Sequence, residues 1–168
     1  MITAQTPLFK KIKFLCIHCT ATPEGRDMTA KQIRDYHTLP VAKGGRGWKT
    51  PGYVDVIRLN GDIENIVPYD DNEYMESREI TNGVLNMNSI TRSFVYVGGM
   101  SKDMKQPKDT RTDAQKEVMA AYIKKVIEAI PDILVAGHNQ FAAKACPSFD
   151  TVRWLRSVGI PDKNIYKK

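Results

Sequence analysis

The sequence has no hydrophobic run long enough to cross a membrane. Every apolar stretch falls well short of the ~20 residues that a bilayer-spanning helix needs. The first stretch, residues 14–17, is also shorter than the ~7–15 apolar residues of a signal-peptide core. We therefore expect a chain that is made in the cytoplasm without a signal peptide and has no membrane span.

Cysteine is also scarce, with three residues in a chain of 168. Cys16 and Cys19 lie close together near the N-terminus, and Cys146 lies far from both in the sequence. Three cysteines in this arrangement do not make the disulfide framework of a small secreted domain. We expect all three thiols to be reduced.

Internal repeats, low-complexity tracts and domain boundaries are absent from the sequence. A chain of 168 residues, 42% of them hydrophobic, is long enough to bury the core of one globular domain. We expect a single domain over residues 1–168, monomeric, in which residues 1–9 form a loose N-terminal arm.

The net charge is positive, at +6, and the pI is near 9.2. Such a balance either favours a polyanionic partner, such as nucleic acid or an anionic cell envelope, or reflects nothing specific. Lys and Arg are dispersed, with no dense basic run and no aromatic-interleaved motif of the RNA-binding kind. The charge therefore does not favour nucleic acid as the ligand.

Strands and helices alternate in the predicted secondary structure. Short apolar runs bounded by turn formers predict strands over residues 12–19, 53–59, 63–67, 93–97 and 133–136. Asn60-Gly61 joins the second and third strands as a hairpin. This alternation predicts an α/β fold in which helices flank a central mixed sheet.

Capping boxes predict where two helices begin. Thr29 with Gln32 opens a helix over residues 29–38, and Thr112 with Gln115 opens a longer one that ends before Pro131. A third helix is expected over residues 149–158. The residues spaced to face the core are Ile33, Tyr36 and His37 in the first helix and Met119, Tyr122, Ile123, Val126, Ile127 and Ile130 in the second.

Two histidines and a cysteine form a candidate metal site. His18 and His138 each lie at the end of a predicted strand, where loops bring distant residues together. Cys146 follows His138 by eight residues, which would span about 12 Å on a helix, so this segment must loop back for both side chains to reach one ion. Imidazole and thiolate donors suit zinc.

The number of ligands decides what such an ion does. Three protein ligands leave a fourth position to water, whose pKa zinc lowers to about 7, and this predicts hydrolysis. Cys16 or Cys19 as a fourth ligand would instead close a structural site. Strand alternation points Cys19 away from His18, and Cys16 in the middle of the run fits a small buried residue. On spacing alone, packed or surface histidines remain an alternative.

Four segments together resemble the zinc-dependent N-acetylmuramoyl-L-alanine amidases, and most of all the small phage lysozymes of amidase type. The resemblance extends over residues 12–156, and its most specific part is the last motif. The segments are IHCTAT at 17–22, GY and its hairpin at 52–61, NSI with VGG at 88–99, and GHNQFAAKACPSFD at 137–150.

The resemblance implies a role for five residues. It implies that His18, His138 and Cys146 bind Zn²⁺, and that Tyr53 and Lys144 are catalytic. A Lys144 ammonium would stabilise the oxyanion that develops on the carbonyl and would favour the thiolate form of Cys146. Tyr53 would orient water or pass a proton to the leaving amine. From the residues alone, a packed tyrosine and a solvated loop lysine would be the preferred interpretations.

The chain departs from the family pattern at two positions. Val54 and Thr81 stand where the family commonly has histidines, and we expect altered substrate contacts there. The segment from Ser89 to Gly99 is two residues longer than usual. The helix residue His37 matches a family histidine with no expected role beyond packing.

The implied activity is hydrolysis of the amide between N-acetylmuramic acid and L-alanine of peptidoglycan by a phage lysin that reaches the cell wall after release. Three alternatives stay open. They are a peptidoglycan-recognition module without activity, a cytoplasmic amidase that recycles muropeptides, and a lysozyme that also binds a regulatory protein partner such as a polymerase.

Overall fold

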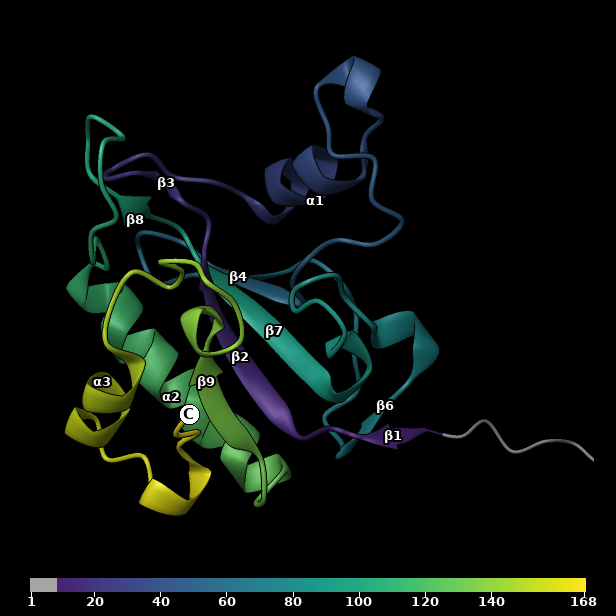
Figure 1. Cartoon of the computed structure of the whole chain (residues 1–168), viewed down its shortest axis with the longest axis vertical. Coiled ribbons are helices and arrows are strands. Elements are labelled where there is room, and N and C mark those ends of the chain that lie inside the picture. Colours follow the sequence, from purple (N-terminus) through teal and green to yellow (C-terminus); the bar gives the residue numbers. More distant parts are fainter. Residues whose placement is uncertain (1–8) are drawn as a thin grey trace, which may run out of the picture.

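A five-stranded mixed sheet forms the centre of the computed structural model, which describes residues 9–168. Its strands lie in the order β5 (Ile63–Asn65), β4 (Asp55–Ile57), β7 (Thr91–Tyr96), β2 (Phe14–Cys19) and β9 (Leu134–Gly137). Figure 1 labels the last four of them. The last four of these run parallel, and β5 pairs antiparallel with β4 at the edge. The predicted α/β class with a mixed central sheet is confirmed.

The five predicted strands are present with different ends. The hairpin at Asn60-Gly61 forms as predicted, with the Arg58 amide donating to Asp62 O at 2.9 Å. β4 starts only at Asp55, so Tyr53 lies in the bend before the strand rather than inside it. The predicted arm at residues 1–9 falls almost entirely outside the described residues.

Two small sheets were not predicted, because two-residue strands carry no periodicity to recognise. β1 (Lys10–Lys11) pairs antiparallel with β6 (Tyr74–Met75), and β3 (Thr22–Pro23) pairs parallel with β8 (Gly99–Met100). Five short 3₁₀ turns complete the described chain: η1 (Val41–Lys43), η2 (Ser77–Glu79), η3 (Asn88–Ile90), η4 (His138–Gln140) and η5 (Asp162–Asn164).

Three helices cover the sheet: α1 (Ala30–Thr38), α2 (Asp113–Ala129) and α3 (Thr151–Ser157). Both predicted capping boxes are formed, by Thr29 at α1 and by Thr112 at α2, and Asp150 caps α3. Within residues 9–168, no helix combines the length and the hydrophobicity that crossing a membrane requires.

The sheet has a buried core on each face. α2 and α3 pack on one face through Met119, Ile123 and Leu155, against β2, β7 and β9. α1 packs on the other face through Ala30 and Ile33. Because side chains alternate along a strand, the neighbouring β7 residues Phe94 and Val95 belong to different cores.

The prediction that Tyr36 faces the core is wrong, since 51% of this residue is exposed. Ile33 and His37 are buried as predicted. Successive helical residues point about 100° apart. Only a narrow stripe of α1 packs on the sheet, and Tyr36 lies outside this stripe, toward solvent.

Candidate metal centre

The ends of β2 and β9 bring two histidines together. His18 is the last residue but one of β2, and His138 directly follows β9. The two strands run parallel with Ile17 beside Gly137, so the residue after each of these lies at the same edge of the sheet. The ring centroids of His18 and His138 are 4.5 Å apart. The strand ends therefore meet as the sequence led us to expect.

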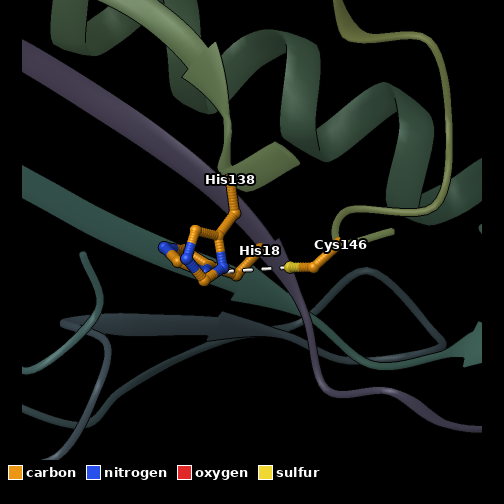
Figure 2. A group of neighbouring side chains, drawn as sticks. All are labelled: His18, His138 and Cys146. Carbon is orange, nitrogen blue, oxygen red and sulfur yellow. Dashed lines mark hydrogen bonds between the residues drawn. The ribbon is translucent and has the colours of Figure 1, made fainter. Parts of the chain in front are cut away.

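Cys146 reaches the same place from the loop after η4. The loop turns back on itself, and the Asn139 amide donates to Cys146 O at 2.7 Å. The Cys146 Sγ then lies 3.8 Å from His18 Nδ1 and accepts a hydrogen bond from the backbone amide of Cys19 at 3.3 Å. Figure 2 shows the thiol and the two imidazoles pointing toward one another.

The spacing of these three donors fits a zinc ion. One donor atom from each of His18, His138 and Cys146 lies within 4.8 Å of the other two. Two ligands of a tetrahedral zinc ion, each ~2.0–2.3 Å from it, lie roughly 3.3–3.8 Å apart, so donor atoms within 4.8 Å of one another need to approach by no more than about 1.5 Å. Among residues 9–168, no further His, Cys, Asp or Glu belongs to this group.

The other two cysteines do not complete a four-ligand site in this arrangement. Cys16 is fully buried in the middle of β2. The Cys19 thiol lies 3.7 Å from Ser148 Oγ, and Cys19 does not belong to the three-residue group. The geometry therefore favours three protein ligands.

Both imidazoles are held neutral. Burial lowers the pKa of His18 well below its usual value, and the nearby His138 and Lys144 lower it further. Burial also lowers the pKa of His138, followed by the charge of Lys144. A neutral imidazole keeps a lone pair on one nitrogen, which is the form that binds a metal.

The Cys146 thiol keeps its proton in the metal-free chain. A hydrogen bond with the Cys19 side chain and burial raise the pKa of the Cys146 thiol. The charge of Lys144 lowers the pKa of both histidines, and its expected effect on the thiolate of a metal-bound Cys146 stays a prediction. A coordinated cation deprotonates a bound thiol directly.

Tyr53 lies beside His18, and Lys144 lies in the loop that carries Cys146. The Tyr53 ring centroid is 4.9 Å from that of His18, and burial raises the pKa of the Tyr53 hydroxyl, which stays protonated. Lys144 is exposed in the loop before Cys146 and is close enough to lower the pKa of both histidines. The positions agree with the predicted site, while the catalytic roles remain predictions.

Sequence reasoning missed Ser93, whose Oγ lies 3.2 Å from His18 Nε2. It also missed how His37 is held, with Nδ1 accepting from the Gly52 amide at 3.2 Å and the ring stacked on Trp48. Strand alternation would have found Ser93 only if the pairing of β2 with β7 had been known. Isolated polar residues carry no such pairing information.

The two departures from the family pattern lie inside the protein. Val54 is 1% exposed and Thr81 is 2% exposed. Side chains so deeply buried do not favour direct contact with a substrate. If Val54 and Thr81 alter substrate contacts, they must do so by changing the position of neighbouring residues that touch the substrate.

Phage endolysins are similar to this chain in sequence. The endolysin of Enterobacteria phage K11 is 28% identical over 142 residues, which cover 84% of this chain and 83% of that protein. The endolysin of Escherichia phage T7 is 29% identical over 139 residues, covering 82% of each chain.

Solved structures share the fold at lower identity. The Ph2119 endolysin from a Thermus scotoductus bacteriophage matches with a TM-score of 0.66 and 20% identity, covering 92% of each chain. The bumblebee protein PGRP-SA matches with a TM-score of 0.62 and 20% identity, covering 87% of this chain and 81% of its own. The family model described as N-acetylmuramoyl-L-alanine amidase matches residues 8–149, and the chain belongs to this family.

Proposed function

We propose that this chain is a zinc-dependent hydrolase that cleaves the amide bond between N-acetylmuramic acid and L-alanine of peptidoglycan, and that it acts as an endolysin. One observation carries the proposal: His18, His138 and Cys146 present three donor atoms to one point, each within 4.8 Å of the others. Membership of the amidase family and similarity to phage endolysins support the choice of substrate.

The three donors suit zinc in type as well as in spacing. Two neutral imidazoles and one thiolate form a ligand set that zinc accepts, and a three-ligand set is typical of its catalytic sites. When bound, zinc supplies Lewis acidity that activates water and polarises a carbonyl. The remaining chemistry falls to the side chains around the site.

We assign Lys144 the role of stabilising negative charge. Attack of water on the amide carbon moves charge onto the carbonyl oxygen, which needs fixed donors or cations nearby. The ammonium of Lys144 is within electrostatic reach of both histidines, as their lowered pKa values indicate. We propose that this ammonium stabilises the negative charge on the carbonyl oxygen.

We assign Tyr53 the role of supplying a proton. The C–N bond breaks only if the leaving nitrogen of L-alanine gains a proton, while the lactyl carbonyl becomes a carboxylate. Burial raises the pKa of the Tyr53 hydroxyl, so it is a donor rather than a base at neutral pH. No hydrogen bond joins this hydroxyl to another residue in the part of the chain that the structure describes, which leaves it free for a substrate.

A recognition module without activity is the second candidate, because PGRP structures share this fold. The complete three-donor group favours catalysis, since binding of peptidoglycan alone does not require a metal. A recycling amidase would use the same chemistry on soluble muropeptides. An endolysin should turn over intact sacculi faster, and a recycling amidase should turn over soluble muropeptides faster.

Digestion of purified sacculi followed by mass spectrometry tests the proposal. We expect stem peptides with a free L-alanine amino group and glycan strands with a free lactyl carboxyl. His138→Ala serves as the inactive control. Intact sacculi after incubation with zinc-loaded protein, or cleavage only at other bonds, would contradict the proposal. Faster turnover of soluble muropeptides than of sacculi would favour recycling over lysis.

A further inference from the structure

The His18 ring has a hydrogen-bonding partner on the neighbouring strand. Ser93 lies on β7, where its Cα pairs with that of Cys16, so its side chain is on the same face of the sheet as Cys16 and His18. Its Oγ is 3.2 Å from His18 Nε2, and both residues are 1% exposed. The contact is therefore a buried one, out of reach of solvent.

The two nitrogens of His18 face different groups. Nδ1 faces the donor group, 3.8 Å from Cys146 Sγ, whereas Nε2 faces Ser93. A neutral imidazole has one N–H and one lone pair, and the hydrogen bond made by one nitrogen decides which tautomer is present. If Nε2 carries the hydrogen, Nδ1 is left with the lone pair that a metal needs.

We propose that Ser93 is a positioning residue that accepts a hydrogen bond from His18 Nε2–H and so holds Nδ1 ready to bind the metal. The proposal rests on the proposed zinc site and extends it by one residue. Partners on the outer nitrogen of a metal-binding histidine are most often carboxylates, carbonyls or water. Here a serine hydroxyl from the adjacent strand takes that position.

The surroundings of Ser93 suit a small hydroxyl and little else. A Cβ on Gly83 would lie 2.5 Å from Ser93 Oγ, so the backbone of Gly83 closes the space on that side. The main chain of Ser93 is used separately, since its carbonyl accepts from the Val54 amide at 2.8 Å. Replacing serine by alanine therefore removes the contact with His18 and leaves the attachment of β4 in place.

Ser93→Ala and a matched control test this assignment. The control is Thr91→Val, which removes a buried hydroxyl from the same face of the same strand. Thr91 Oγ1 makes no hydrogen bond within residues 9–168, so its loss leaves no partner unpaired. Thermal unfolding of both variants shows whether they fold like the wild-type chain.

Two measurements on the full chain read out the role of Ser93. Nitrogen-15 NMR of the chelator-treated protein reports the His18 tautomer, and competition with a chromogenic chelator reports zinc affinity. We expect the Nε2–H tautomer in the wild-type chain and in Thr91→Val. In Ser93→Ala we expect this preference to be lost and zinc affinity to fall ~10–100-fold.

Two results would overturn the assignment. One is an Nδ1–H tautomer of His18 in the wild-type chain, which needs no variant to be observed. The other is a Ser93→Ala chain with unchanged tautomer and unchanged zinc affinity. A wild-type chain that binds no zinc would contradict the proposed function instead, and the tautomer measurement would still decide the role of Ser93.

Discussion

His18 Nδ1 and Cys146 Sγ lie 3.8 Å apart although 128 residues separate them in the sequence. The first is fixed by a central strand and the second by a loop that turns back after β9. A contact between a buried imidazole and a thiol, with a second imidazole beside them, is the feature on which the proposed activity depends.

Cys146→Ser should remove most of the bound zinc and most of the activity while the fold survives. Cys146 is only partly buried and lies at the edge of the core, so its replacement leaves both helix-to-sheet interfaces intact. Loss of a residue that only hydrogen-bonds to a metal ligand typically lowers metal affinity ~10–100-fold. Cys146 would bind the ion itself, so we expect its replacement to lower zinc affinity by more than this. Metal analysis after dialysis and far-ultraviolet circular dichroism would measure the two effects.

Cys19→Ala is the matched control for this substitution. It removes a neighbouring sulfur but keeps the backbone amide that donates to Cys146. We expect zinc to be retained. Loss of zinc in Cys19→Ala equal to that in Cys146→Ser would show that Cys19 is a ligand and that the three-ligand account is wrong.

Lys144→Ala should keep the metal and lose rate. Lys144 is exposed and contributes no donor to the three-residue group, so stability and zinc content should not change. Loss of one group that stabilises an oxyanion typically lowers kcat by ~10²–10³-fold. Steady-state kinetics on a soluble muropeptide would measure this, and an unchanged kcat would remove Lys144 from the mechanism.

Tyr53→Phe should lower kcat with little change in zinc content. The substitution keeps the ring that packs 4.9 Å from His18 and removes only the hydroxyl. Loss of a general acid typically costs ~10²–10⁴-fold in rate. If kcat stays within a few-fold of the wild-type value while Lys144→Ala is impaired, another group must protonate the leaving amine.

His37 should make stability depend on pH between about 6.5 and about 4. Burial lowers the pKa of His37 from 6.5 to about 4, so below pH 6.5 the unfolded chain takes up this proton before the folded chain does. The contribution of neutral His37 to the free energy of unfolding is thus fully present above pH 6.5 and is lost as the pH falls toward 4. With allowance for partial solvent access, the loss is of order 2 kcal/mol.

His37→Asn tests this linkage because an asparagine oxygen can accept the hydrogen bond from Gly52 that Nδ1 now accepts. Urea unfolding at several pH values should show a flatter pH dependence for the variant than for the wild-type chain. Parallel curves for the two proteins would show that His37 does not titrate in this range.

Local signals in the sequence predicted much of the fold. Capping boxes at Thr29 and Thr112 and the hairpin turn at Asn60-Gly61 depend on residues three or fewer apart, and all three are present in the structure. Tyr36 was placed wrongly because helical spacing gives the direction of an apolar stripe but not its width.

The site was predictable only in part. His18 and His138 could be placed because strand ends meet at one edge of a sheet. Ser93 could not, because its contact with His18 depends on which strand lies next to β2. The effect of the Lys144 charge on the pKa of His18 and His138 was not predicted either, because it depends on the path of the loop between His138 and Cys146.

Zinc-edge X-ray absorption of the purified full-length protein tests the central claim most directly. We predict one sulfur at about 2.3 Å and lighter nitrogen or oxygen neighbours at about 2.0–2.1 Å, from Cys146, two imidazoles and one non-protein ligand. The sulfur contribution should vanish in Cys146→Ser. A spectrum that needs two sulfurs, or a protein that takes up no zinc, would contradict the account.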